Sequence, residues 1–188
     1  MGRSLNRSTE SGVTLIEILV IMVILAVLAA FAIPTVAVWL PNYRLKSAAR
    51  DLYSNFQMAK MGAVNKNSDW AVILDRSSSP SRYSIVSGRG DNGVWNVPVD
   101  DEPIEKIVYL DKPHGIRFGH GDAGKPVPVA GTFGDEITFL NNVAVFNPRG
   151  TGNDGYVYLQ NEKNTAYAVG KRSSGVILLR KWRGSEWQ

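Results

Sequence analysis

An apolar run from Val13 to Ile33 contains a single charged residue, Glu17, and constrains the fold more than any other feature of the chain. About 20 apolar residues span a lipid bilayer, whereas the apolar region of a secretory signal has about 7–15. We therefore predict a transmembrane helix segment over residues 13–40. A carboxylate at the centre of such a helix costs about 2.5–3.5 kcal/mol, and less near an end, so Glu17 is expected to have a partner and a function.

A short polar segment, residues 1–12, precedes the apolar run and contains Arg3 and Arg7. Basic residues beside a membrane span remain in the cytoplasm. The alanine-rich end of the run, from Ala29 to Ala32, continues the helical pattern and is not expected to be a secretory cleavage site. The sequence thus predicts a single-pass inner-membrane protein with a cytoplasmic N-terminus and a periplasmic head.

Beyond the membrane segment, apolar residues recur at steps of three and four positions, which places them on one face of a helix. They are Leu45, Ala48, Ala49, Leu52, Phe56, Ala59 and Ala63. We therefore predict an amphipathic continuation of the helix over residues 41–67. Pro34 is expected to kink the helix, because a proline in the helix interior removes one backbone hydrogen bond.

After Asp69 the apolar pattern changes to a period of two, which is typical of strands with one buried face. The predicted strands are Trp70–Leu74, Tyr83–Val86, Lys106–Leu110, Gly115–Phe118, Glu136–Leu140, Val143–Phe146, Tyr156–Gln160, Thr165–Val169 and Val176–Lys181. Turn-forming residues separate them, and Ser87–Pro103 and Gly119–Gly134 are predicted to be loops. The fold class is therefore α+β: a long N-terminal transmembrane helix followed by an antiparallel β-sheet head over residues 68–188.

The boundary of the apolar run reads Gly12-Val13-Thr14-Leu15-Ile16-Glu17 and closely resembles the signal of type IV prepilins and pseudopilins. In that family a membrane peptidase cuts after the glycine and methylates the new amino terminus. The resemblance implies that residues 1–12 are a leader peptide, that the cut falls between Gly12 and Val13, and that Val13 is methylated. Family members usually have Phe at the position of Val13, and this substitution keeps the apolar character. The Val13 amine and the Glu17 carboxylate are then expected to pair between neighbouring subunits during assembly.

A second resemblance lies near the C-terminus, where Phe146 to Thr151 read Phe-Asn-Pro-Arg-Gly-Thr and precede a predicted strand. This segment is similar to one in the GspH/FimT group of minor pseudopilins. The resemblance implies a non-enzymatic subunit of a type II secretion pseudopilus, a filament that supports the export of folded proteins. It implies no cofactor, and its partners are the prepilin peptidase, major and minor pseudopilins, the inner-membrane assembly platform and membrane lipid. The chain has no cysteine, whereas many major pilins close a C-terminal loop with a disulfide.

Two alternatives remain open: a FimT-like minor type IV pilin in pilus biogenesis or DNA uptake, and a signal-anchored periplasmic enzyme. The sequence offers the enzyme no convergent catalytic set. Gly119 to Lys125 has the spacing of a phosphate-binding loop, but Pro126 follows where a magnesium-binding Ser or Thr is required. The two histidines, His114 and His120, are expected in solvated loops, and the acidic run from Asp100 to Glu102 is expected in a solvated turn and not in a calcium site.

The C-terminal tail places Arg180, Lys181 and Arg183 beside tryptophans, a combination that can bind the backbone and bases of DNA. FimT-like pilins that bind DNA carry a Gly-Arg-x-Arg element on the last strand, whereas the corresponding stretch here, Gly175 to Leu178, has no arginine. In a strand, Arg180 and Lys181 point to opposite faces. We therefore expect weak DNA contact at most, and nucleic acid is not an expected partner.

Overall fold

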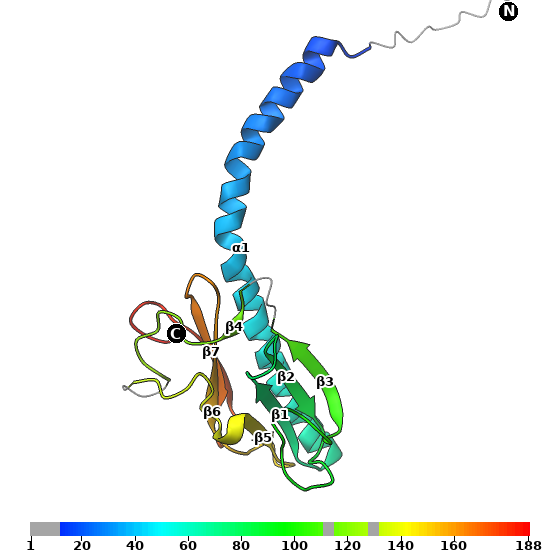
Figure 1. The fold of residues 1–188 in the computed structure, drawn as a ribbon, viewed down its shortest axis with the longest axis vertical. Coiled ribbons are helices and arrows are strands. Elements are labelled where there is room, and N and C mark those ends of the chain that lie inside the picture. Colours follow the sequence, from blue (N-terminus) through cyan, green and yellow to red (C-terminus); the bar gives the residue numbers. More distant parts are fainter. Residues whose placement is uncertain (1–11, 111–114, 128–131) are drawn as a thin grey trace, which may run out of the picture. The chain divides into compact units, whose positions relative to one another are not determined.

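The computed structural model describes residues 12–110, 115–127 and 132–188, with the backbone alone for residues 32–38. It contains one long helix followed by antiparallel strands, so the predicted α+β class is confirmed (Figure 1). Residues Leu40–Gln188 form one compact unit, the head, and the chain before Leu40 forms a separate unit. The predicted leader lies almost wholly outside the described residues.

Helix α1 (Leu15–Lys66) ends within the polar run that follows the apolar face. Asn67 adopts a left-handed conformation with φ of 50°, and the N–H of Ser68 donates to the carbonyl of Ala63 at 3.2 Å. This arrangement satisfies a carbonyl that the helix end leaves without an intrahelical partner. The backbone is helical at Pro34, where the kink stays a prediction because side chains of residues 32–38 are not described.

The described residues of the head form two four-stranded antiparallel sheets, which we call sheet A and sheet B. Sheet A has the order β3-β2-β1-β5, with β1 (Trp70–Asp75), β2 (Arg82–Val86), β3 (Ile104–Tyr109) and β5 (Val143–Phe146). Sheet B has the order β4-β6-β7-β8, with β4 (Arg117–Phe118), β6 (Gly155–Gln160), β7 (Ala166–Lys171) and β8 (Ile177–Lys181). A short 3-10 helix, η2 (Leu140–Asn142), precedes β5.

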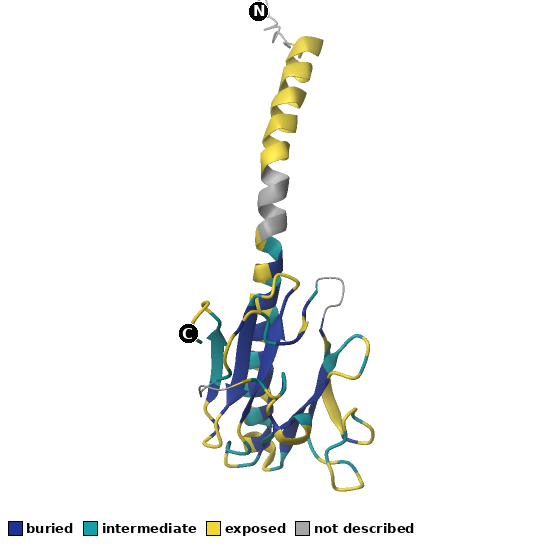
Figure 2. Ribbon diagram, turned by 60° about the vertical axis from the view of Figure 1, so that its left-hand side comes forward, coloured by how far each residue is buried: buried dark blue, intermediate teal, exposed yellow. Residues whose placement is uncertain are grey.

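One hydrophobic core joins the head part of α1 to the inner faces of both sheets, and Figure 2 shows the buried strands around this part of the helix. All the predicted apolar helix positions except Ala48 are fully buried, and Ala48 is partly buried against the same core. Phe56 lies at the centre, with its ring edge-on to Phe139 and Phe146 at centroid distances of 5.9 Å each. The three- and four-residue spacing therefore identified the face of α1 that packs on the sheets.

The outer face of each sheet is also covered, which explains why the central strands are buried on both sides. Loop residues Trp95 and Val99 pack on Ala71 and Ile73 of β1. On sheet B, a second cluster forms around Tyr158, with Val127, Phe133 and Trp187 from the long loop and the C-terminal tail. The loops thus supply apolar cover for both sheets.

Two predicted strands are not observed as predicted. Over Glu136–Leu140 the chain makes a single bridge, Ile137 to Val157, and then turns into η2. The alternation that suggested a strand is real, since Ile137 and Phe139 are buried, but Leu140 is 76% exposed. Asn141 has a φ of 55° within η2, which ends the extended backbone. The strand predicted over Gly115–Phe118 is reduced to the two residues of β4.

Candidate processing and assembly site

Thr14 is the N-cap of α1 and fixes where the helix begins. Its Oγ1 accepts a hydrogen bond from the N–H of Glu17 at 3.2 Å. Its carbonyl oxygen accepts from the N–H groups of Glu17 and Ile18 at 3.1 and 3.2 Å. A threonine followed three residues later by a glutamate is the sequence signature of a capping box. Thr14 was not among the predicted site residues, although the spacing alone carries the signal.

Glu17 lies in the first turn of α1, where the unpaired N–H groups of the helix create partial positive charge. This position favours a carboxylate, so the helix offsets part of the cost of a charge in an apolar segment. Gly12 and Val13 precede the helix and are exposed. A Cβ added at Gly12 would meet nothing within 4 Å. Among the described residues, packing therefore gives no reason for a glycine at this position.

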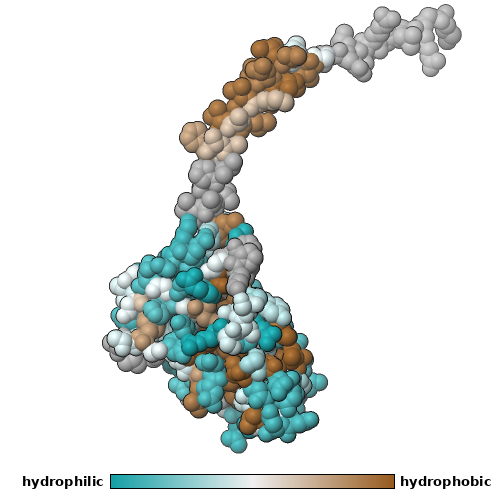
Figure 3. Space-filling model, viewed as in Figure 1, coloured by the Kyte–Doolittle hydropathy of each residue, from teal (hydrophilic) through white to brown (hydrophobic). Residues whose placement is uncertain are grey.

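The described side chains between Leu15 and Phe31 are apolar apart from Glu17, and the large hydrophobic ones are exposed, as the brown surface in Figure 3 shows. Within the described part of the chain, no helix meets the length and hydropathy needed for a membrane span.

Asn42 attaches the first head turn of α1 to sheet B. Its Oδ1 accepts hydrogen bonds from Asn161 Nδ2 and from Thr165 Oγ1, each at 2.9 Å. Asn161 is fully buried, and its own Oδ1 accepts from the N–H groups of Lys163 and Thr165 at 3.0 Å each. Asn161 therefore fixes the shape of the turn between β6 and β7 and also binds Asn42 of α1.

Asn55 makes the corresponding attachment to sheet A. Its Nδ2 donates to the hydroxyl of Tyr83 at 2.8 Å, and its Oδ1 accepts from Lys106 Nζ at 3.1 Å. Burial raises the pKa of Tyr83 to about 12, with the negative charge of Asp51 acting in the same direction and the Asn55 hydrogen bond opposing it. Tyr83 therefore remains a neutral hydroxyl and accepts this bond at every physiological pH.

The C-terminal motif forms a close-packed pair of turns. Asn147 Oδ1 accepts from the N–H groups of Arg149 and Thr151 at 3.0 and 3.2 Å. Gly175 has a φ of 82°, and a Cβ there would collide with the carbonyl oxygen of Gly150. Lys60 Nζ of α1 donates to the carbonyl of Gly175 at 2.9 Å. Gly175 therefore permits the close approach of the two turns.

Lys171 lies against this motif and is the most unusual charged residue of the head. Its side chain is 0% exposed, and its Nζ has no hydrogen-bond partner among the described residues. The ammonium lies 4.7 Å from the centroid of the Phe146 ring, which supplies a weak cation–π attraction. Burial lowers the pKa of Lys171 to about 8; Asp154 opposes this effect and Lys60 adds to it. No sequence pattern marked this residue, because a lysine at a strand end is ordinarily exposed.

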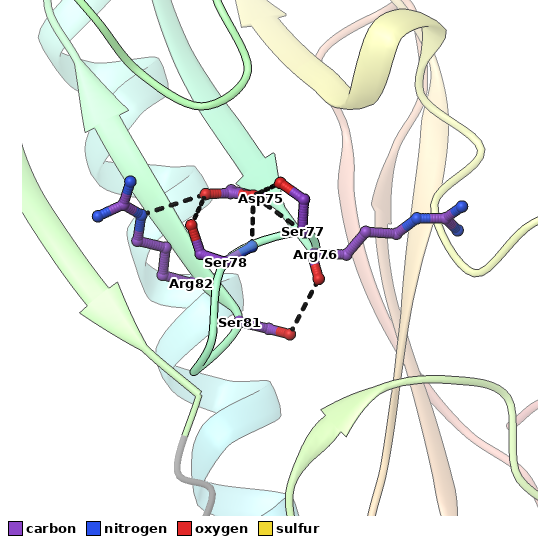
Figure 4. Close-up of polar contacts among 6 residues, drawn as sticks. All are labelled: Asp75, Arg76, Ser77, Ser78, Ser81 and Arg82. Carbon is purple, nitrogen blue, oxygen red and sulfur yellow. Dashed lines mark hydrogen bonds and ion pairs between the residues drawn. The ribbon is translucent and has the colours of Figure 1, made fainter.

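Asp75 organises the turn between β1 and β2 (Figure 4). Its Oδ1 accepts from the N–H and the hydroxyl of Ser77 at 3.0 and 2.6 Å and from the N–H of Ser78 at 3.1 Å. Its Oδ2 accepts from the hydroxyl of Ser78 and from Arg82 Nε, the latter at 3.3 Å. Burial alone would raise the pKa of Asp75, but the hydrogen bonds from Ser77 and Ser78 outweigh burial and lower it. This carboxylate is therefore a structural anion that holds the turn.

Arg76 points away from the Asp75 cluster (Figure 4) and contacts the segment before η2. Its Nη1 lies 2.5 Å from Asp135 Oδ1 and 2.8 Å from Glu136 Oε2. All three side chains are between 38% and 50% exposed, and exposed ion pairs contribute about 0–1 kcal/mol. Arg76 therefore links the turn after β1 to the segment before η2 only weakly.

The acidic run expected in a solvated turn has a different role, and that prediction is wrong for Glu102. Glu102 is 4% exposed, and its carboxylate accepts from the N–H groups of Asn96 and Asp100. Asp101 accepts from Asn96 Nδ2 at 3.1 Å. These carboxylates shape the loop between β2 and β3 because they satisfy its backbone donors. Among the described residues, no group of three His, Asp or Glu side chains could hold a metal ion.

The predicted loop histidines are only partly described, since His114 lies outside the described residues. His120 is half-buried and stacks on Phe133 with ring centroids 3.9 Å apart. Pro126 and Val127, the described residues directly after Lys125, are not helical, whereas a phosphate-binding loop leads into a helix.

The basic tail does not form a one-sided cluster. On β8, Leu178 packs on the outer cluster of sheet B and Leu179 on the central core, so Arg180 and Lys181 lie on opposite faces. Lys181 Nζ lies 5.9 Å from the ring centroid of Tyr167. The N–H of Arg183 donates to the carbonyl of Glu186 at 2.9 Å, within a small hairpin that closes the chain. This arrangement does not favour a DNA-binding surface.

Comparison with known proteins gives the family of this chain. Residues 7–33 match the prokaryotic N-terminal methylation motif, and residues 48–175 match the type II transport protein GspH. The minor pseudopilin EpsH from the Type 2 Secretion System of Vibrio cholerae is similar over 71% of this chain and 94% of its own, at 15% identity and a TM-score of 0.45. No curated protein matches the chain.

The chain belongs to the GspH family of type II transport proteins, because that model covers more than half of its length. It is therefore a minor pseudopilin of type II secretion, and its family and fold are those of a structural subunit and not of an enzyme family. Membership in this family implies interaction with other pseudopilins.

Proposed function

We propose that a prepilin peptidase cuts this chain between Gly12 and Val13 and methylates the new amine of Val13. The match to the N-terminal methylation motif over residues 7–33 carries the proposal. The structure supports it in two ways: Gly12 and Val13 are exposed before the helix, and among the described residues no atom lies within 4 Å of a Cβ placed on Gly12. Both features suit recognition by another protein.

The processed chain crosses the inner membrane once, with its N-terminus cytoplasmic and its head periplasmic. In this arrangement the apolar side chains from Val13 onward face lipid before assembly and other helices after it. The assembly platform then adds the subunit to a pseudopilus that contains major and minor pseudopilins.

Glu17 sets the position of the subunit in the filament. After the cut, Val13 carries a positive charge that survives methylation. The Glu17 carboxylate lies in the first helical turn, where a neighbouring subunit's amine can reach it in one register. A subunit in a wrong register would leave both charges unpaired in an apolar environment, and removing one partner of such a pair costs about 3–5 kcal/mol. The pair therefore selects the correct register.

Replacement of the carboxylate tests this mechanism. In cells with the complete secretion system, Glu17→Gln should leave membrane insertion intact but remove the subunit from sheared pseudopili. Glu10→Gln is the matched control, because Glu10 precedes the cut and is absent from the processed chain. Incorporation of the Glu17→Gln chain at the level of the control would contradict the ion-pair mechanism.

A further inference from the structure

The chain itself protects most edges of its two sheets. At the β5 edge, the side-chain amide of Asn153 takes the place of a neighbouring strand: its Oδ1 accepts from the N–H of Val145 at 2.8 Å, and its Nδ2 donates to the carbonyl of Val143 at 2.7 Å. At the end of β8, the N–H groups of Lys181 and Gln188 each donate to the other's carbonyl, at 2.7 and 3.0 Å. The remaining edge of sheet B is the two-residue β4.

On β3, no such cap is formed by the described residues. Within Ile104–Tyr109 the described backbone pairs with β2 alone, and a register shift leaves Glu105 without a partner residue in β2. Ile107 is 37% and Tyr109 55% exposed, although both are large and apolar. An uncovered edge strand with apolar side chains is a template for pairing with another chain, and proteins ordinarily block such an edge.

The direction of the free backbone groups follows from one hydrogen bond. The N–H of Leu110 donates to the carbonyl of Ser81 at 2.8 Å, so the backbone of Leu110 points toward β2. Because successive residues of a regular strand alternate, the N–H and C=O groups of Ile107 and Tyr109 point away from β2, and this alternation stops at the register shift beside Glu105. Unpaired N–H and C=O groups at this spacing are complementary to another extended backbone.

A second copy of the chain does not fit this edge. Pairing β3 antiparallel to its own copy requires a two-fold axis normal to the sheet. The head part of α1 packs against the face of the sheet. Rotation about this two-fold axis would therefore make α1 of the second copy run in the opposite direction. Anchored subunits of one membrane have parallel helices under the function proposed above. A second copy related by the symmetry of the filament has its helix parallel to that of the first copy. Such a copy would place its β5 beside β3, because β5 runs opposite to β3. Asn153 already occupies the β5 edge, so this pairing is blocked.

We propose that the β3 edge docks a strand from the head of a different pseudopilin, one whose own antiparallel edge is uncovered. The occupant is an extended segment that places an apolar side chain beside Ile107 and a basic one beside the exposed Glu105. Because β3 is open and β5 is capped, the head accepts a neighbour on one side of sheet A only. This inference rests on the proposed function, since the partner is another subunit of the same filament.

Photo-crosslinking in cells with the complete secretion system tests the edge. A benzophenone amino acid at Tyr109 should give an adduct with another pseudopilin, with the attachment mapped to a strand of that protein's head. The same amino acid at Ser54, an exposed position on α1, is the control for general proximity. An adduct with a second copy of this chain, an adduct at Ser54 alone, or no adduct at Tyr109 would overturn the proposal.

Two proline variants distinguish a loss of docking at the β3 edge from a loss of stability of the head. Ile107→Pro removes an N–H that points outward, so pairing with β2 should survive while the Tyr109 adduct falls at least tenfold. Val108→Pro removes an N–H that points toward β2 and should destabilise the head in a denaturant titration. An unchanged adduct in the Ile107→Pro chain would contradict the docking edge. Removal of the leader does not depend on the β3 edge, so both variants should still lose it. A parent chain that keeps the leader would contradict the proposed function and not the docking edge.

Discussion

Replacing Lys171 with methionine should stabilise the head, because the lysine places a charge in the core without a hydrogen-bond partner among the described residues. The pKa falls from the ordinary value of 10.5 to about 8 on burial. A difference of this size between unfolded and folded states corresponds to about 3 kcal/mol. The cation–π contact with Phe146 recovers part of the cost, so we expect a net gain of about 2–3 kcal/mol for Lys171→Met near pH 7.

The pH dependence gives this prediction a second test. Below pH 8 the ammonium is charged in both states, so the full cost is present. Between about pH 8 and 10.5 the unfolded chain binds the proton and the folded chain does not, so the stability of the wild type rises with pH. The advantage of Lys171→Met should therefore shrink between pH 7 and pH 10.

The assay is denaturant unfolding of the full chain in detergent, followed by tryptophan fluorescence at the two pH values. Lys125→Met, at an exposed lysine of the same head, is the matched control and should change stability by less than about 0.5 kcal/mol. A Lys171→Met chain that is no more stable than the wild type at pH 7 would refute the reasoning. A difference in unfolding free energy between Lys171→Met and the wild type that stays constant up to pH 10 would also refute it. The gain in stability would then not come from removal of the charge.

Three further predictions concern the capping, core and tail residues. Thr14→Ala should destabilise the first turn of α1 by about 1 kcal/mol and speed hydrogen exchange at the Glu17 amide, whereas Thr14→Ser should not. Phe56→Asp should lower the free energy of unfolding by several kcal/mol, because it buries an unpaired charge at the centre of the core; melting like the wild type would mean that the helix face is wrongly assigned. Duplex DNA should bind only weakly and lose its affinity between low and physiological salt in fluorescence anisotropy; submicromolar binding that survives and needs Arg180 and Arg183 would support a DNA-uptake pilus.

The sequence predicted the elements whose pattern comes from one buried face. The apolar positions of α1 from Leu45 to Ala63 repeat at helical spacing because that face alone packs on the sheets. The strands of sheets A and B were also located, although β1, β6 and β7 are buried along their whole length and therefore on both faces. Glu136–Leu140 has a period of two, but only Ile137 forms a bridge to a neighbouring strand. The alternation predicts which side chains are buried and does not predict how far a neighbouring strand pairs with the segment.

The charged residues of the head were harder to predict, because their roles depend on distant parts of the chain. Lys171 is buried by the motif turns, and Glu102 is buried by the loop that it shapes. The open edge of β3 follows from strand order, and the cap on β5 follows from the position of Asn153 ten residues beyond Val143. None of these features has a local signature. Thr14 does have one, the capping box, and sequence analysis can identify it.

The intact mass of the chain extracted from membranes tests the central claim most directly. The measured mass should show the loss of residues 1–12 and the gain of one methyl group, and fragmentation should place that methyl on the Val13 amine. A Gly12→Ala chain made in the same cells should keep its full length. A wild-type chain that retains residues 1–12 in the presence of the peptidase, or a Gly12→Ala chain that is cut equally well, would contradict it.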